Sequence, residues 1–350
     1  SVSGGGLVEV LEDTNDIALT AVNTPDGVMY RLGLGGITGH KDFARHTGIV
    51  VPPAEAVAVC DAILRVYIAH GDRTNRAKAR LKYLLDAWGL PRFLQEVEAL
   101  LGAPLRRMEE AAIAPATPPL RNGHVGIHAQ KQPNFVYMGV VTRLGRLSAH
   151  QLRGLAAIAE RFGRGELRLT VWQNLLIPDI AEADLDAAKD ALATLDLSHE
   201  AGPVRSGLVA CTGNAGCKFA ASNTKRHAME IAEYVEARLA VDAPVNIHLT
   251  GCHHSCAQHY IADIGLLGAK VERGEEEVEG YDLHVGGGAG PQQKIGRLIT
   301  RVAHDTVGPA VLSLLRAWIE RRRAGESFQG FSARLSDDEL RDLCTAELVA

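Results

Sequence analysis

Six cysteines occur in this 350-residue chain, and four of them form two short pairs. Five residues separate Cys211 from Cys217, and three residues separate Cys252 from Cys256. Thiolates are soft ligands, and four thiolates from two separate loops are the ligand set that a cubane iron–sulfur cluster needs. The spacing therefore predicts a [4Fe-4S] cluster bound by these four cysteines.

A structural zinc site is the main alternative for the same thiolates. Paired zinc ligands are usually separated by two to four residues, so the gap between Cys211 and Cys217 counts against zinc without excluding it. Unrelated cysteines in a protein core are a second alternative.

The two remaining cysteines have ordinary explanations. Cys344 follows Ser336 and Glu339, whose spacing predicts a capping box at the start of a terminal helix with Leu340 and Leu343 facing inward. Cys60 lies in a predicted amphipathic helix over residues 54–69, whose expected buried face comprises Val57, Cys60, Ile63, Leu64, Tyr67 and Ile68. Both thiols are expected to serve packing.

The motifs around the four paired cysteines resemble a known enzyme family. CTGNAGC at residues 211–217 and TGCHHSC at residues 250–256, followed by ADIG and VGGG, are similar to the sirohaem and [4Fe-4S] half of the assimilatory nitrite/sulfite reductases. The similarity extends from LEDTNDIAL to ESFQGF and is nearest to the ferredoxin–nitrite reductases. It implies a [4Fe-4S] cluster and sirohaem as cofactors, with Cys256 as the thiolate that also binds the sirohaem iron.

One position departs from the family pattern. His253 and His254 stand where the family commonly has Pro-Asn. We interpret them as bystanders, with contacts to the macrocycle as the alternative, because the cluster loop already has its ligands. Candidate cations for the substrate anion are Lys218, Lys294 and Arg297, although most such side chains are solvated surface groups.

Three further sequence features can be explained by a structural role as well as by a functional one. Arg321, Arg322 and Arg323 suggest a docking patch for ferredoxin, but at a helix end they are expected to complement the helix dipole. The runs LGLGGITG and VGGGAG lack the pattern of a nucleotide-binding loop. They are interpreted as tight turns where the backbone approaches a flat cofactor.

Composition narrows the class of protein. A net charge of -5 does not favour nucleic-acid binding, and 46% hydrophobic residues exclude a disordered chain. No apolar run approaches the roughly 20 residues that span a bilayer, and the first residues do not have the pattern of a signal peptide. We expect a cytoplasmic protein in a reducing compartment, a monomer that binds neither membrane nor nucleic acid.

Two segments share one layout, which indicates an internal duplication. In residues 13–41 and again in residues 259–293, two strand-like runs flank a polar turn, and a glycine-rich stretch precedes an amphipathic helix. Two unrelated hairpin-plus-helix units are the alternative. About 130 residues precede the second copy, and the first copy has no matching segment before it. The chain is therefore interpreted as a fragment of a longer protein.

The predicted fold is α+β, a pseudo-duplicated nitrite/sulfite reductase fold in which a ferredoxin-like half-domain joins two related mixed α/β domains, the first incomplete. The alternating strands and helices between the copies predict the half-domain. Its strand over residues 166–180 is treated as scaffold, because Trp172 replaces an arginine of the family's first-half strand. The predicted boundaries are 1–110 for the end of the first repeat, 111–119 for a linker, 120–197 for the half-domain and 198–350 for the second repeat.

The resemblance implies six-electron reduction of nitrite to ammonia in nitrogen assimilation, with electrons from reduced ferredoxin or a similar low-potential donor. Assimilatory reduction of sulfite to sulfide is the alternative. A non-catalytic Fe–S electron-transfer module and a role in cobalamin ring chemistry are further alternatives. Because the first-half counterpart is missing, the 350 residues alone are expected to be inactive.

Overall fold

The computed structural model describes residues 1–114 and 120–345, which belong to two compact units. One unit comprises residues 1–120 with residues 289–293, and the other comprises residues 121–288 with the chain from residue 294 onward. Helices and strands are mixed in both, as the α+β prediction requires.

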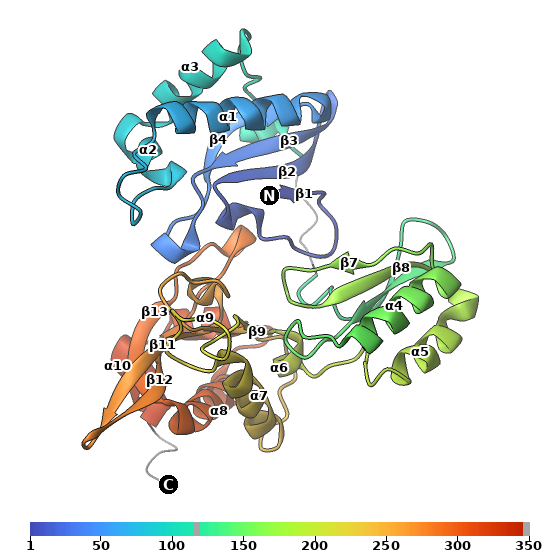
Figure 1. Ribbon diagram of the computed structural model, residues 1–350, viewed down its shortest axis with the longest axis vertical. Helices are drawn as coiled ribbons and strands as arrows, with labels where there is room; N and C mark the ends of the chain where they lie inside the picture. The colour runs from blue at the N-terminus through green and yellow to red at the C-terminus, as the bar shows by residue number, and fades with distance from the viewer. Residues whose placement is uncertain (115–119, 346–350) are drawn as a thin grey trace. The chain divides into compact units, whose positions relative to one another are not determined.

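In the first unit, one sheet is covered by three helices (Figure 1). Its second, third and fourth strands are paired antiparallel by hydrogen bonds. Pro25, Asp26 and Gly27 make the turn between the second and third strands. The sheet order is β1 (Val2–Ser3), β2 (Ile17–Thr24), β3 (Gly27–Leu34) and β4 (Arg45–Val51). The helices are α1 (Ala56–His70), α2 (Leu81–Trp88) and α3 (Leu90–Leu101).

The predicted inward face of α1 was right for Ile63 and wrong for Val57, Leu64 and Ile68. Val59, Ile63 and Val66 are the buried residues that pack on the sheet, whereas Val57 is 82% exposed and Leu64 50% exposed. Two apolar stripes run along this helix, and periodicity alone cannot choose which of them meets the sheet. Cys60 is half-buried at the edge of the core instead of at its centre.

The second unit begins with a four-stranded sheet whose order is β5-β6-β8-β7, with helices α4 and α5 against it (Figure 1). Ser148 caps α4 in a capping box with Gln151. The elements are β5 (Gly126–Ala129), β6 (Phe135–Val140), α4 (Ala149–Phe162), β7 (Arg168–Leu169), β8 (Leu175–Ala181) and α5 (Leu185–Ala193).

The single strand predicted over residues 166–180 was also wrong. Strands β7 and β8 pair antiparallel, and a tight turn joins them. Thr170 makes that turn by donating its backbone N–H to the Asn174 carbonyl at 3.0 Å, and Gln173 adopts a φ of 60°. Nothing in the apolar pattern marked a turn here, because the segment contains neither Gly nor Pro between its two halves.

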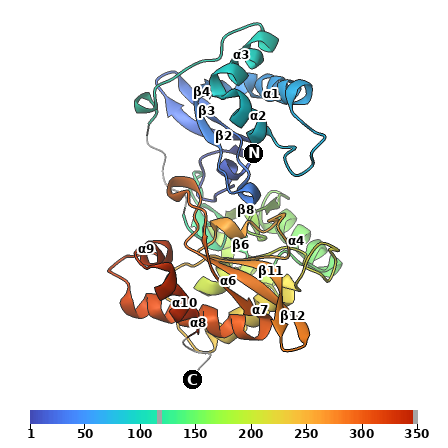
Figure 2. The same ribbon diagram turned by 90° about the vertical axis from the view of Figure 1, so that its left-hand side faces the viewer.

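A five-stranded sheet of order β13-β12-β11-β10-β9 forms the rest of this unit (Figure 2). Helices α7, α8 and α10 pack on it around a core that includes Tyr281 and Trp318. Among the described residues no helix is long and apolar enough to cross a membrane. The elements are α6 (Pro203–Ser206), β9 (Leu208–Ala210), α7 (Thr224–Glu236), β10 (Ile247–Thr250), β11 (Ile264–Arg273), β12 (Glu276–Val285), β13 (Arg297–Ala303), α8 (His304–Arg321), α9 (Phe328–Ala333) and α10 (Asp337–Thr345).

The last helix has the predicted capping box. Ser336 and Glu339 exchange hydrogen bonds, with the Ser336 backbone N–H donating to Glu339 Oε2 at 2.8 Å. Leu340 and Cys344 are fully buried in the core. Burial raises the pKa of the Cys344 thiol to about 12, which keeps it protonated and inert at neutral pH.

The duplicated layout is present in both units, with one strand more than predicted. Strands β2, β3 and β4 lead into α1, and β11, β12 and β13 lead into α8 in the same order. The third strand of each copy was missed, because the glycine-rich stretch before it was expected to lead directly into the helix. These strands complete the two antiparallel meanders.

The two glycine-rich stretches form tight turns, as predicted, and approach their own backbone in the same way. Gly35 and Gly286 have φ values of 87° and 80°. Their backbone N–H groups donate to the backbone carbonyls of Asp16 and Asp263, at 2.8 and 2.9 Å respectively. A Cβ on the next glycine, Gly36, would lie 2.7 Å from the Asn15 carbonyl oxygen. Only glycine fits this close passage.

The predicted linker is described in part. Residues 111, 112 and 114 are exposed, as expected for a connection, whereas residues 115–119 lie outside the described residues.

Replacing Gly36 with alanine should destabilise the first unit. The added Cβ would overlap the Asp13 and Asn15 backbone, and overpacking of this kind costs about 1–3 kcal/mol. Urea unfolding followed by circular dichroism should show an earlier transition for Gly36→Ala. Gly6→Ala is the matched control, since a Cβ there meets nothing within 4 Å. Equal urea midpoints for Gly36→Ala and Gly6→Ala would contradict the prediction that only glycine fits at residue 36.

Candidate functional site

Two neighbouring parallel strands bring the cysteine pairs together. In the register of β9 and β10, Ala210 lies opposite Leu249. Cys211 follows β9 directly, and Cys252 follows β10 after Gly251. Because the carboxyl ends of adjacent parallel strands meet at one edge of a sheet, the loops that carry the four thiols emerge side by side.

Hydrogen bonds join the two loops. The Cys211 backbone N–H donates to the Leu249 carbonyl at 3.0 Å, and the Gly251 N–H donates to Cys211 Sγ at 3.2 Å. Ala221 donates its N–H to the Gly251 carbonyl at 2.8 Å, and a Cβ at Gly251 would come within 2.5 Å of Ala220 Cβ. A glycine before Cys252 is therefore needed for the loops to pack this closely.

The four thiols lie within electrostatic reach of one another. Burial raises the pKa of the Cys256 thiol, and the negative charges of Cys211, Cys252 and Cys217 raise it further. Cys256 is exposed, while the other three are half-buried. A cation that binds all four thiolates would relieve this mutual repulsion, so the set fits a thiolate-bound metal group.

Among the described residues, no group of three or more His, Cys, Asp or Glu side chains could hold a single metal ion. The ligands of a cubane each bind a different iron and do not have to meet at one point. The structure places the loops that carry Cys211, Cys217, Cys252 and Cys256 at one edge of the sheet, and the binding of a cluster by these four thiols stays a prediction.

Glu279, on β12, anchors the loop of residues 211–217 and was missed by the sequence analysis. It accepts hydrogen bonds from Asn214 Nδ2 at 2.7 Å and from the Asn223 backbone N–H at 2.9 Å. Burial alone would raise the pKa of this carboxyl, but the two hydrogen bonds outweigh it and hold the pKa below its ordinary value. Glu279 is therefore charged at neutral pH. Nothing in the alternating pattern of β12 distinguishes it from its exposed neighbours.

His254 contacts one of the paired thiols, which the interpretation as a bystander did not anticipate. Its Nδ1 lies 3.3 Å from Cys252 Sγ. The His253 ring is 4.4 Å from the His254 ring, and Phe219, itself 59% exposed, meets His254 edge-on at 5.3 Å. A thiolate bound to iron carries no proton, so the imidazole would have to donate in this contact.

The segment that contains the β7–β8 turn contacts β9, the strand that leads into Cys211. Gln173, in the β7–β8 turn, donates to the Ala210 carbonyl at 2.8 Å and accepts from the Ala210 N–H at 3.2 Å. Arg121 forms an ion pair with the fully buried Asp263. Trp172 is buried and stacks on His124 at 5.3 Å, consistent with its predicted scaffold role.

The cations proposed from sequence have other partners or stand exposed. Arg297 pairs with Asp337 at 2.5 Å and donates to the Ser332 carbonyl at 2.7 Å. Lys218 is exposed, with its Nζ 5.3 Å from the Phe219 ring, and Lys294 lies in a bridge with Gly288. At the end of α8, Arg322 pairs with Asp242, while Arg321 and Arg323 are exposed.

Comparison with known protein families identifies the chain. The nitrite and sulphite reductase 4Fe-4S domain matches residues 1–105 and 202–349, and the nitrite/sulfite reductase ferredoxin-like half domain matches residues 128–195. The chain belongs to the nitrite/sulfite reductase family. Two matches to one domain also confirm the internal duplication predicted from sequence, and the fold prediction with it.

Individual relatives agree with this assignment. The chain is 35% identical over 320 residues to ferredoxin–nitrite reductase from Synechococcus elongatus, and 33% identical over 348 residues to sulfite reductase [ferredoxin] 2 from Mycolicibacterium paratuberculosis. It covers 62% of the length of each, with 90% and 96% of its own residues. The solved structure of the Mycobacterium tuberculosis NirA protein superimposes with a TM-score of 0.88 at 33% identity, over 95% of this chain and 62% of that one.

A more distant likeness shows the fold alone. Dissimilatory sulfite reductase I matches with a TM-score of 0.53 at 11% identity. Membership of the family implies a [4Fe-4S] cluster and sirohaem as cofactors. The convergent thiols fit the first of these, and the exposed Cys256 is accessible to the second.

Replacing Glu279 with glutamine should loosen the loop of residues 211–217. A hydrogen bond to a charged group stabilises by about 1.5–3 kcal/mol, so amide hydrogen exchange in this loop should become at least about tenfold faster. Glu277→Gln is the control, because Glu277 is exposed on the same strand. The anchor role would be refuted by loop exchange that is the same in both variants.

Proposed function

We propose that this chain is the cluster-bearing part of an assimilatory nitrite reductase, which reduces nitrite to ammonia with electrons from reduced ferredoxin or a similar low-potential donor. The observation that carries the proposal is the meeting of four cysteine thiols at the end of β9 and β10, in a chain 35–37% identical to several ferredoxin–nitrite reductases. The chain spans 59–62% of two of these relatives and 54% of the third, so activity belongs to a longer protein.

Sulfite reductase is the second candidate. The relatives named for sulfite reduction are 32–33% identical but align over 347 or 348 residues, more than the nitrite reductases do. Nitrite is preferred because of the motifs LEDTNDI, GLGGITGHKD and RLTVWQN, which resemble those of ferredoxin–nitrite reductases.

We assign Cys211, Cys217, Cys252 and Cys256 as the cluster ligands. Cys256 is assigned as the thiolate shared with the sirohaem iron, and its exposure supports this assignment because a shared ligand must be reachable by a second group. Cys60 and Cys344 are not assigned as ligands, since each is a single cysteine on a helix, packed against apolar core residues.

The proposed organisation follows the sequence boundaries. Residues 1–110 would be the end of the first repeat, residues 111–119 a linker, residues 120–197 the ferredoxin-like half-domain and residues 198–350 the second repeat. All six cysteines are free thiols, which supports a reducing, cytoplasmic setting. We further propose that the protein acts as a monomer.

The chemistry divides between cofactor and protein. When bound, the cofactors supply one-electron transfers and an iron that holds the substrate anion. The chain would supply four thiolates. The Gly251 N–H donates to Cys211 Sγ, and His254 Nδ1, 3.3 Å from Cys252 Sγ, would donate to that sulfur once it is a thiolate. Hydrogen bonds to cluster sulfurs are among the interactions that set the reduction potential. Glu279 and Gln173 hold the loop and strand that position Cys211.

Anaerobically purified protein should contain about four irons and four sulfides per chain. Cys211→Ser should lower both contents sharply, because a hard alkoxide is a poor substitute for a soft thiolate. Cys60→Ser is the control and should leave iron and sulfide unchanged. In the full-length protein, Cys256→Ser should disturb the cluster and the sirohaem spectrum together. Stoichiometric zinc in place of iron would rule out the cluster.

Steady-state kinetics of the full-length protein test the substrate. With a low-potential donor, kcat/KM should be higher for nitrite than for sulfite, and the isolated 350 residues should show no turnover. A visible spectrum separates a non-catalytic electron-transfer module from a reductase, since only a bound tetrapyrrole adds a Soret-type band. A higher kcat/KM for sulfite would reverse the substrate assignment.

A further inference from the structure

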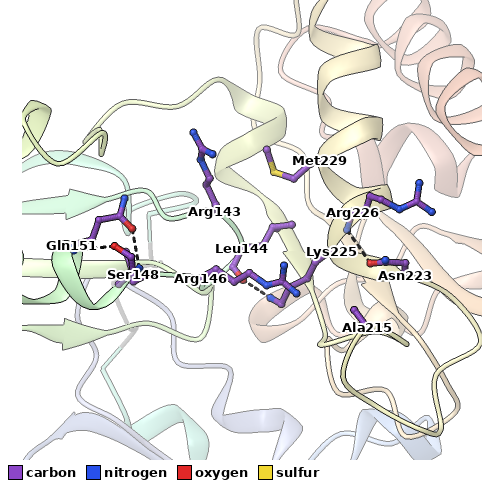
Figure 3. A pocket seen from close by; sticks show the side chains of 11 residues that line it. Arg143, Leu144, Arg146, Ser148, Gln151, Ala215, Asn223, Lys225, Arg226 and Met229 are labelled. Atoms are coloured by element: carbon purple, nitrogen blue, oxygen red, sulfur yellow. Dashed lines mark hydrogen bonds between the residues drawn. The ribbon is translucent and has the colours of Figure 1, made fainter.

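A cavity of about 650 Å³ lies in the second unit, between the loop from β6 to α4 and the first turns of α7. Its lining includes Arg143, Arg146, Lys225 and Arg226, and no acidic side chain (Figure 3). Ala215 of the loop between Cys211 and Cys217 also lines it. Cavities of this size typically hold small molecules. The protein has a net charge of -5, so this positive concavity runs against the overall charge.

The cationic groups in this cavity differ in how far they are neutralised. Arg226 pairs with Glu230 at 3.0 Å, and Arg143 pairs with Asp196 at 3.1 Å, where both side chains are highly exposed. Among the described residues, Arg146 has no acidic partner. A guanidinium offers five N–H donors, so those of Arg146 are available to a ligand.

Lys225 is a fixed second cation. Its Nζ donates to the Leu144 carbonyl and, at 3.1 Å, to the Ala210 carbonyl, which leaves one of its three N–H groups. Burial lowers the pKa of this ammonium, and the nearby positive charge of Arg146 lowers it further. The positive charges of Lys225 and Arg146 repel each other, which costs free energy. An anion bound between them would offset that repulsion.

The loop that carries these donors is held in place. Leu144 adopts a φ of 55° and is buried in the core of the five-stranded sheet, so the segment of Arg143 and Arg146 is anchored at its middle. The capping residues Ser148 and Asn223, at the starts of α4 and α7, both line the cavity. The partial positive charges of two helix N-termini therefore add to those of the side chains.

We propose that this cavity binds a small molecule bearing phosphate or carboxylate groups, with Arg146 and the remaining N–H of Lys225 as its principal donors. The half-buried position of Lys225 favours a small molecule over a protein surface, because the convex face of a partner would contact mainly the exposed Arg143 and Arg226. The proposal does not depend on the proposed reductase activity. Because Ala215 lines the cavity, a bound ligand would also affect the loop between Cys211 and Cys217.

Calorimetric titration with inorganic phosphate and with citrate tests the proposal, and comparing the two probes identifies the preferred acid group. The protein as purified should bind at least one probe saturably in the millimolar range at constant ionic strength, set with chloride. Arg146→Gln should weaken that binding by about tenfold or more, as expected when a charged donor is lost. It should fold normally, because the Arg146 side chain makes no hydrogen bond or ion pair with any residue that the structure describes.

Arg153→Gln is the matched control. Arg153 is an exposed arginine of α4 that does not line the cavity and donates only to the Ala149 carbonyl. This variant should bind the probes as the unchanged protein does. Equal loss in both variants, or no saturable binding of either probe, would overturn the proposal. Arg146-dependent binding of an acidic electron-donor protein, with neither probe bound, would overturn it in favour of a docking surface.

Discussion

The parallel pairing of β9 with β10 is the constraint on which the candidate site depends. Each strand is short and fully buried, and each ends at a cysteine loop, so one register of hydrogen bonds fixes where all four thiols emerge. A change of register by one residue would separate Cys211 from the Gly251 N–H, which lies 3.2 Å from its sulfur. The ligand geometry is therefore a property of the sheet as much as of the loops.

Elements far away in the chain stabilise this edge of the sheet. Gln173 binds both backbone groups of Ala210, and Glu279 binds the loop beyond Cys211 from the next antiparallel strand pair. Charged and amide groups of this kind suit a region whose thiolates repel one another, because they order the backbone without adding apolar bulk near the sulfurs. The duplicated β-meander supplies the scaffold for them, and its glycines allow the chain to pass closely over itself.

Features that depend on the spacing of residues could be predicted from the sequence. The prediction failed where one sequence pattern is compatible with two different structures. The capping box of Ser336 and Glu339 was readable because its signature lies within a few residues, and the duplication was readable because one layout occurs twice. The inward face of α1 was readable only in part: Ile63 is fully buried as predicted, but Val57 and Leu64 are as apolar as the buried Val59. The β7–β8 turn, the anchor Glu279 and the contact of His254 with Cys252 arise from tertiary context, for which a single sequence carries no signal.

The central claim is that all four thiolates bind one cluster, and alkylation of the iron-loaded chain tests it most directly. Cys256 is exposed, so as a free thiol it should react with iodoacetamide at a pH high enough to ionise a thiol whose pKa is raised. The account predicts that mass spectrometry finds Cys211, Cys217, Cys252 and Cys256 protected together, and modified together once the iron is removed with a chelator. Rapid modification of Cys256 in the iron-loaded chain, at the rate seen after iron removal, would contradict it.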